Sequence, residues 1–103
     1  MADPMRIRAT SKGDSTEVRV LMAHEMETGT RKDASGKVVP AHFISNVTVS
    51  HSGKVVLSAE WGPAIAKNPF LQFSFAGGKK GDEVTVTWTD NKGDSRTDKA
   101  VIS

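Results

Sequence analysis

The residues of this chain that could bind a metal ion are gathered around one stretch, residues 24–42. His24 and His42 stand at the two ends of this stretch, and two methionines lie close to the first of them in the sequence. With Met22 or Met26, the two histidines would offer the nitrogen and sulfur ligands that copper(I) favours. Spacing in the sequence fixes no ligand geometry, whereas a metal site needs a defined one. We therefore predict no bound metal and no cofactor, with both histidines as ordinary residues at strand ends.

The acidic residues of the same stretch do not form a convincing catalytic pair. A general acid and base must converge on a substrate, but Glu25, Glu27 and Asp33 lie in a highly charged segment beside Arg31, which favours internal ion pairing. The chain lacks the Gly-x-Ser-x-Gly nucleophile elbow and the His-x-Glu signature of zinc deaminases. The glycine-rich residues 77–82 lack the Ser/Thr and the helix that follow a phosphate-binding loop, so we expect a hairpin loop there. We predict no catalytic residue and no enzymatic activity.

Composition and charge argue against several classes of protein. The chain contains no cysteine, which excludes disulfides, thiolate metal sites and a cysteine nucleophile. The net charge is only +2, and the basic residues do not form the clusters that nucleic-acid binding usually needs. No apolar run approaches the roughly 18 residues that span a membrane. The first five residues have neither the basic start nor the apolar segment of a signal peptide.

Alternation of apolar and polar residues is the dominant structural signal, and it predicts β-strands. Glycine- and aspartate-containing turns separate the strands, and we expect His51, beside one of them, to be exposed. About seven short strands in roughly 100 residues predict an all-β protein, an immunoglobulin-like antiparallel β-sandwich. We predict one domain, residues 1–103, with residues 1–4 frayed. The expected inward rows are Met5-Ile7-Ala9, Val18-Val20-Met22, Phe43-Ser45-Val47-Val49, Val55-Leu57-Ala59-Trp61, Leu71-Phe73-Phe75 and Val84-Val86-Trp88.

One long connection interrupts this pattern between residues 24 and 41. Loops longer than about 12–15 residues without structure of their own are uncommon, and are usually functional or disordered. This one carries apolar residues, so we interpret it as an arm or extended hairpin that contacts another chain. Phe70 follows Pro69 at a strand start and points away from the predicted core, as an exposed anchor would. The predicted partner-binding residues are His24, Met26, Arg31, Val38, Val39 and Phe70.

Three segments carry a resemblance to a known family, and together they span nearly the whole chain in the expected order. They are HEMETGTRKD at residues 24–33, WGPAIAKNPF at residues 61–70 and WTDNKGD at residues 88–94. In these the chain resembles the SoxZ family, the Z subunits of the bacterial thiosulfate-oxidation carrier. The resemblance implies an immunoglobulin-like sandwich that forms a heterodimer with SoxY. It also implies that SoxY carries the sulfur intermediates, on a cysteine in a C-terminal Gly-Gly-Cys-Gly-Gly arm.

The resemblance further implies a non-catalytic subunit that reaches the periplasm in complex with SoxY. There it would help to present SoxY to the enzymes of sulfur oxidation through transient contacts. A chain without cysteine cannot hold sulfur as a thiol adduct, which fits the non-carrying half of such a complex. The alternative is a small periplasmic copper-binding β domain that uses His24, His42 and a methionine.

Overall fold

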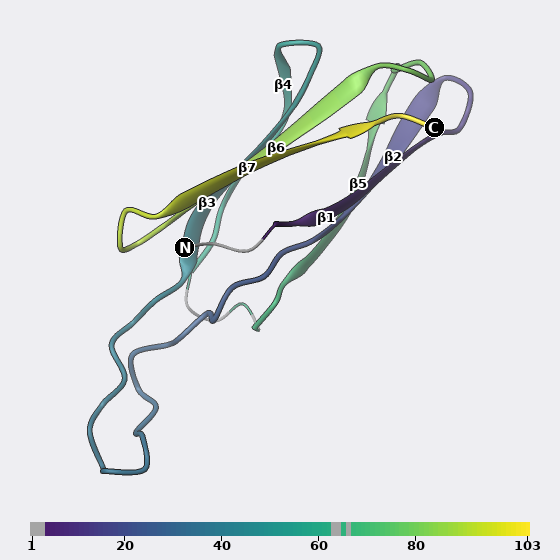
Figure 1. Ribbon diagram of the computed structural model, residues 1–103. Coiled ribbons are helices and arrows are strands. Elements are labelled where there is room, and N and C mark those ends of the chain that lie inside the picture. The colour runs from purple at the N-terminus through teal and green to yellow at the C-terminus, as the bar shows by residue number, and fades with distance from the viewer. Residues whose placement is uncertain (1–3, 63–64, 66) are drawn as a thin grey trace.

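The described residues form seven strands, which pair into two antiparallel sheets (Figure 1). The computed structural model describes residues 4–62, 65 and 67–103, so residues 1–3 of the expected frayed end lie outside it. The sheets have the orders β1-β2-β5 and β4-β3-β6-β7. In an immunoglobulin-like sandwich the fourth strand can join the larger sheet in this way, so the predicted fold class is confirmed. The bounds are β1 (Arg6–Ser11), β2 (Ser15–Leu21), β3 (Ile44–His51), β4 (Lys54–Glu60), β5 (Phe70–Ala76), β6 (Glu83–Asp90) and β7 (Ser95–Val101).

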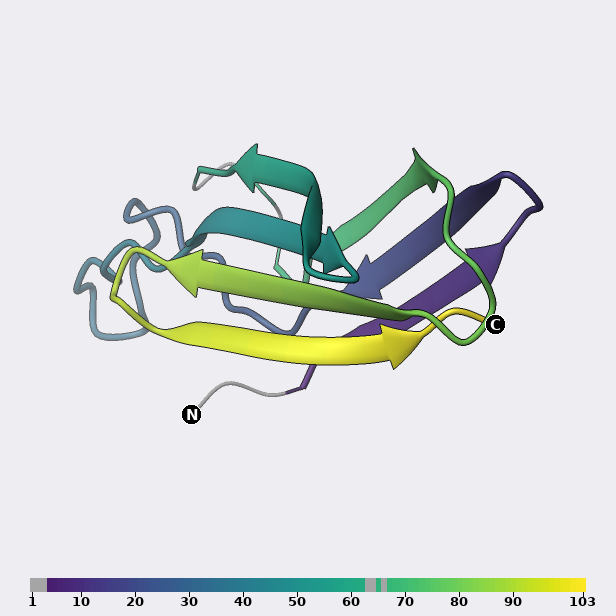
Figure 2. The same cartoon turned by 90° about the horizontal axis from the view of Figure 1, so that it is seen from above.

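Figure 2 shows the strands of the two sheets from above. The core lies between the sheets and is formed by the inward rows of their strands. On β2 and β6 these rows are almost completely buried, as the alternation predicts; they contain Val18, Val20, Val84, Val86 and Trp88. Full burial of one such aliphatic side chain contributes about 1.5–3 kcal/mol to folding. No helix among the described residues is long and apolar enough to cross a membrane.

The predicted inward rows of β3 and β4 are partly wrong, because β3 is irregular near both ends. Its pairing shifts register once against β6 and once against β4. An extra residue in a strand reverses the facing of the residues beyond it. Ile44 is therefore buried, whereas Phe43 and Ser45 are only half-buried. On β4, Val55 is 56% exposed, and Val56 packs against the core in its place.

The glycine-rich segment 77–82 joins the two sheets and does not close a hairpin, which corrects the expectation from the sequence. Its two flanking strands, β5 and β6, belong to different sheets. The segment packs against the buried Thr16 of β2, whose hydroxyl donates a hydrogen bond to the Gly77 carbonyl oxygen at 2.7 Å. It also exchanges backbone hydrogen bonds with Ile102 near the end of the chain. The segment therefore helps to hold both sheets together at this end of the sandwich.

Candidate functional site: a projecting arm and its histidine–aspartate anchor

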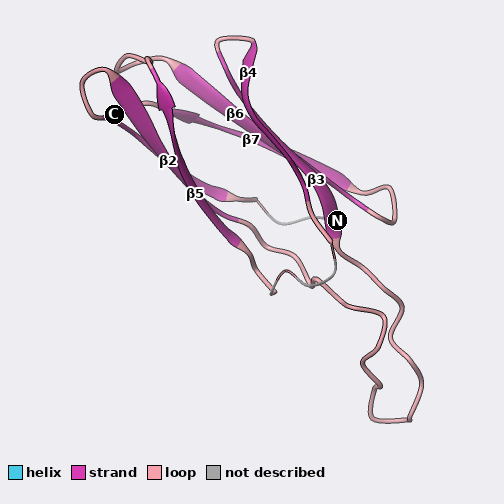
Figure 3. Cartoon of the chain, turned by 180° about the vertical axis from the view of Figure 1, so that it is seen from behind, coloured by secondary structure: helices cyan, strands magenta, loops and turns pink. Residues whose placement is uncertain are grey.

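Residues 24–43 leave one end of the sandwich as a two-legged arm that extends beyond both sheets (Figures 1 and 3). The legs pair through two isolated bridges, Glu27 with His42 and Lys32 with Val38. At the first bridge, the Glu27 N–H donates to the His42 carbonyl at 2.6 Å, and the His42 N–H donates back at 3.0 Å. The long connection is therefore an extended hairpin, as one of the two interpretations of the sequence predicts.

Polar contacts, with little apolar packing, order the outer part of the arm. The Asp33 carboxylate accepts hydrogen bonds from the Ser35 hydroxyl, the Ser35 N–H and the Lys37 N–H. These bonds lower the pKa of Asp33, and the bond from the Ser35 hydroxyl contributes most. Arg31 donates to Glu27 through Nε at 3.0 Å and Nη2 at 2.9 Å, which raises the pKa of Arg31 and lowers that of Glu27. The expected ion pairing within the arm is thus present, and the tip has a defined shape without a partner.

A buried carboxylate, Asp90, anchors both legs of the arm to the sandwich. Its Oδ2 accepts hydrogen bonds from Nε2 of His24 at 3.0 Å and from Nε2 of His42 at 2.7 Å. Its Oδ1 accepts hydrogen bonds from the backbone N–H groups of Lys92 and Asp94 in the β6–β7 turn. The centroids of the two imidazole rings lie 4.5 Å apart, so the fold brings together the two ends of the stretch singled out from the sequence. One residue therefore ties the two legs of the arm to the β6–β7 hairpin.

Reasoning from the sequence missed Asp90, because it placed this residue in the turn after β6. The alternation of inward and outward residues along β6 could have identified it. Val84, Val86 and Trp88 point inward, and residue 90 is the next position on the same face. A carboxylate that continues an apolar row is a candidate for burial, and a buried carboxylate needs several hydrogen-bond donors. Only the fold shows that two of these donors come from the arm.

The pKa of Asp90 is set by two opposing influences. Burial, the larger single influence, raises it, but the hydrogen bonds from His24, His42, Asp94 and Lys92 together outweigh burial and lower it. A carboxyl with a lowered pKa in the folded state stabilises the fold above its unfolded pKa of about 3.9. This contribution is lost as the pH falls through the folded pKa.

As the pH falls below the unfolded pKa of about 3.9 and through the lowered folded pKa, we expect the protein to lose unfolding free energy more steeply than its Asp90→Asn variant does. The variant has no ionisable group at this position, whereas the other carboxyls with lowered pKa values are common to both proteins. Urea denaturation at a series of pH values measures the two slopes. Parallel pH profiles would show that the ionised Asp90 carboxylate does not stabilise the fold.

The same cluster has the composition of a metal site, but the position of the proton on the His24 ring favours a hydrogen-bonded anchor. One ligand atom each of His24, His42 and Asp90 lies within 4.8 Å of the others. The Met26 N–H donates to Nδ1 of His24 at 3.0 Å, so Nδ1 carries no proton. A neutral imidazole then has its proton on Nε2, the atom that faces Asp90. A metal ion needs a lone pair on that atom, so His24 could bind a metal there only after the Met26 bond breaks. The absence of a metal stays a prediction, and this geometry supports it.

Met26 lies at the point where the arm leaves the sandwich, and it corrects the expectation of exposed apolar character. Only 5% of the residue is exposed. Its φ of +51° is in the left-handed region, which is uncommon for a residue other than glycine. Its backbone N–H bonds to His24, and its Sδ accepts a hydrogen bond from the Ile44 N–H at 3.3 Å. The same bond engages one of the two sulfur atoms, those of Met22 and Met26, that the copper-binding alternative could use. Because Met26 is part of the core, it fixes the direction of the arm and presents no side chain to a partner.

The other predicted partner-binding residues differ in how accessible they are. Val38 at the arm tip is 55% exposed and Phe70 on β5 is 57% exposed. Arg31 is exposed and Val39 is half-buried. His24 is buried in the anchor. The predicted role of these residues in binding a partner stays a prediction.

The third histidine, His51 at the end of β3, is not the exposed residue that the sequence suggests. Its Nε2 lies 2.8 Å from Oδ2 of Asp82, and its ring packs against Phe75 with centroids 5.2 Å apart. The hydrogen bond to His51 is the main cause of the lowered pKa of Asp82. His51 is far from His24 in the fold because it lies at the opposite end of β3 from the arm.

Solved structures with a similar fold come from proteins of distant sequence. The hypothetical protein PH1083 from Pyrococcus horikoshii OT3 matches with a TM-score of 0.63 and 18% identity, over 99% of this chain and 89% of its own. The superoxide reductase (neelaredoxin) from Ignicoccus hospitalis matches with a TM-score of 0.62 and 17% identity, over 99% of this chain and 80% of its own. A superoxide reductase (neelaredoxin) variant from Archaeoglobus fulgidus, in the reduced form, matches with a TM-score of 0.55 and 18% identity, over 97% of this chain and 86% of its own. At these identities the likeness shows the fold alone.

The family of the chain is shown by its sequence over nearly its whole length. No curated protein matches it significantly in sequence. Residues 5–101, however, match the family described as "Sulphur oxidation protein SoxZ". This range contains all seven strands, the arm and Asp90. The chain belongs to the SoxZ family of sulphur oxidation proteins.

Proposed function

We propose that this chain is the non-catalytic subunit of a heterodimeric sulfur carrier. It pairs with a cysteine-bearing SoxY-type subunit and holds that subunit in position for the enzymes of thiosulfate oxidation. The family match over residues 5–101 supports the place in sulfur oxidation. The absence of cysteine means that a thiol adduct of sulfur must be carried by a partner. The complex is proposed to act in the periplasm and to be exported as a unit, with transient contacts to the pathway enzymes.

The observation that carries the binding role is the shape of the arm. It projects from the sandwich, yet hydrogen bonds within the chain hold its base, through Asp90, and its tip, through Asp33. A segment already held in its binding conformation loses less entropy when it binds. Val38 is exposed at the tip, where it can be buried by a second chain. Permanent complexes often bury more than about 2,000 Å², and an arm adds area that the sandwich alone does not offer.

A shortened arm tests this role without disturbing the anchor. The Val39 N–H donates to the Arg31 carbonyl at 2.7 Å, so an Asn-Gly turn in place of residues 32–38 would close a tight hairpin at that point. We expect the shortened protein to keep its unfolding midpoint, because the replaced residues lie outside the core. We expect its Kd for the SoxY-type subunit to rise about tenfold or more, since part of the interface is removed. Calorimetry with the purified subunits measures both properties.

Two valines of nearly equal exposure give a matched control for the same proposal. Val38 on the arm is 55% exposed and Val55 on β4 is 56% exposed. We expect Val38→Ala to raise the Kd about fivefold, since it removes apolar area that the partner would bury, and Val55→Ala to leave it unchanged. Unchanged binding by the shortened arm would remove the arm from the interface. If the intact chain binds no SoxY-type subunit, or turns over thiosulfate without one, the proposed function is wrong.

A further inference from the structure

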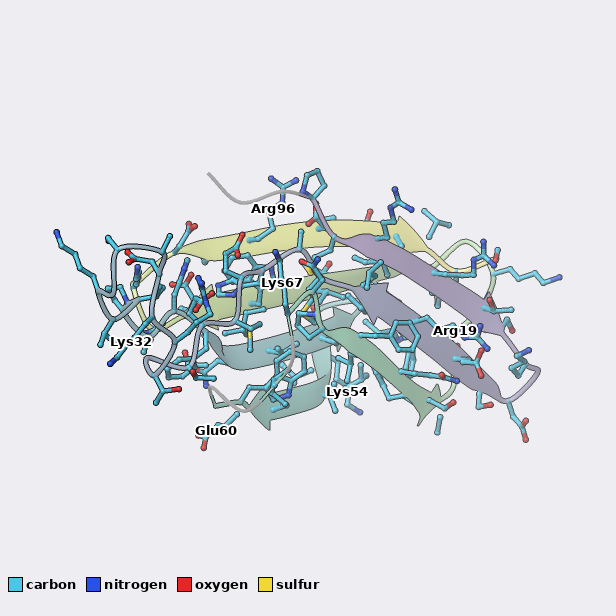
Figure 4. The ribbon with its side chains drawn as sticks, turned by 90° about the horizontal axis from the view of Figure 1, so that it is seen from below. Arg19, Lys32, Lys54, Glu60, Lys67 and Arg96 are labelled. Atoms are coloured by element: carbon cyan, nitrogen blue, oxygen red, sulfur yellow. The ribbon has the colours of Figure 1, made fainter. Side chains whose placement is uncertain are left out.

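The outer face of the three-stranded sheet carries three arginines beside two exposed apolar side chains. The register places Arg8 directly opposite Arg19, Arg6 opposite Leu21, and Leu21 opposite Phe70 on the next strand. Their neighbours along β1, β2 and β5 are more buried than they are, so all five point outward. They line a shallow hollow of about 270 Å³. We call this set the arginine face; it consists of Arg6, Arg8, Arg19, Leu21 and Phe70, and Figure 4 shows Arg19 within it.

The charge arrangement on this face is unfavourable in the isolated chain. Like charges directly opposite each other on paired strands destabilise a sheet, and this applies to Arg8 and Arg19. Arg19 is partly neutralised by Glu17, whose carboxylate lies 3.2 Å from its Nε. Among the described outward residues of β1 and β2, Glu17 supplies one negative charge against the three positive charges of the arginines. Negative charge from another molecule would remove the repulsion and would be attracted to this face.

The apolar half of the face indicates what carries that negative charge. Leu21 is 42% exposed and Phe70 is 57% exposed, and they lie side by side on paired strands. Exposed ion pairs contribute only about 0–1 kcal/mol each, so a small inorganic anion would bind the arginines weakly and leave this apolar pair uncovered. A polypeptide segment with carboxylates next to apolar side chains matches both halves. A nucleic-acid backbone would match only the charged half.

The arginine face continues into the base of the arm. An adjoining hollow is lined by Arg6, Leu21, Ala23 and Asn68, among others. Asn68 in turn accepts a hydrogen bond through Oδ1 from the His24 N–H at 3.1 Å. A chain that lies against the arm can therefore reach the arginine face without crossing a gap.

We propose that the arginine face binds an acidic, partly apolar segment of the same SoxY-type subunit, so that the face and the arm form one docking surface. This inference rests on the proposed function. Complementary charge at an interface steers association and makes it sensitive to salt. The arginine half of the surface supplies this steering, and the Leu21–Phe70 pair supplies the apolar centre.

Arg8→Glu separates binding from folding, because we expect it to weaken binding of the partner without lowering the stability of the isolated chain. In the isolated chain it replaces a like-charge pair with an opposite-charge pair across from Arg19, so the unfolding midpoint should stay the same or rise. In the complex it puts a negative charge against the acidic segment. We expect the Kd for the SoxY-type subunit to rise about tenfold or more at low salt, and its salt dependence to weaken. Leu21→Ala with Phe70→Ala should also raise the Kd while retaining the salt dependence.

Lys54→Glu is the matched control, since it makes the same change of charge on β4 of the other sheet. We expect its Kd, measured at the same salt concentration, to stay within about twofold of the original value, because Lys54 lies on the other sheet and outside the arginine face. Equal weakening by Arg8→Glu and Lys54→Glu, or no weakening by Arg8→Glu, would overturn the docking surface and leave the proposed function standing. Loss of duplex-DNA binding in Arg8→Glu with unchanged binding of the subunit would overturn it in favour of nucleic acid. Failure of the original chain to bind the subunit would overturn the proposed function itself.

Discussion

Replacing Asp90 with alanine should lower the free energy of unfolding by about 3–5 kcal/mol, because several donors lose their acceptor and a buried donor left without one costs about 1–3 kcal/mol. Four donors lose their acceptor together: Nε2 of His24, Nε2 of His42, and the N–H groups of Lys92 and Asp94. His24 is buried in the folded chain, so water cannot easily replace the lost partner. Urea denaturation of the purified chain measures the change directly.

Two further variants show which side of the carboxylate matters. In Asp90→Asn the amide oxygen can still accept both backbone bonds of the β6–β7 turn, but the amide N–H₂ faces the two histidine donors. We expect about half the loss seen with alanine, because only the bonds to the arm are broken. Hydrogen exchange at the Glu27 and His42 amides, which form the first bridge of the arm, should become faster. Asp14→Ala, at an exposed turn carboxylate, should change stability by less than about 0.5 kcal/mol. A loss below about 1 kcal/mol in Asp90→Ala would contradict the anchoring role.

Gly78→Ala should lower the free energy of unfolding by about 2–4 kcal/mol, although it adds one methyl group. The φ of Gly78 is +87°, which alanine adopts only with strain, and an added Cβ would overlap Oγ1 of Thr16. Thr16 cannot simply turn away, since it is buried and its hydroxyl donates to the Gly77 carbonyl oxygen. The side chain of Ile102 lies 3.3 Å from the same point. Thermal and urea unfolding with unchanged far-UV circular dichroism would establish the loss.

Gly81→Ala separates the two causes of this loss. Gly81 has a similar φ of +94°, but nothing lies within 4 Å of an added Cβ, so only the backbone strain of about 1–2 kcal/mol applies. Combining Gly78→Ala with Thr16→Ala should cost less than the sum of the two single changes, because the second change makes room for the first. Equal losses in Gly78→Ala and Gly81→Ala, or strict additivity in the double variant, would show that contact with Thr16 is unimportant.

The inward faces of β2, β5 and β6 could be predicted from the sequence because each strand alternates without interruption. On β3 and β4 the prediction was wrong only near the register shifts in the pairing, at residues such as Ile44 and Val55, whereas Val47 and Val49 are buried as predicted. A bulge depends on how two strands meet, and neither strand records it alone. The exposure of Met26 was also predicted wrongly, because its backbone conformation could not be predicted from the sequence. Its side chain is buried because a positive φ turns it toward the core.

Only part of the candidate site could be predicted from the sequence. His24 and His42 were recognised as a pair that could meet, whereas their shared acceptor lies 48 residues beyond His42 and was assigned to a turn. The cross-strand pairing of Arg8 with Arg19 was equally hidden, since it follows from the register of β1 on β2. Phe70 was correctly placed on the outside of its strand, because Pro69 marks where β5 begins.

By itself the sequence determined the all-β class, the family and the lack of a thiol, because periodicity, motifs and composition are local properties of the chain. Tertiary structure alone decided that Asp90 holds both legs of the arm, and that three arginines share one face with Leu21 and Phe70. These contacts join residues far apart in the sequence, and strand register determines which of them meet. The period of a single strand indicates which face a residue occupies, but not which residue lies opposite it.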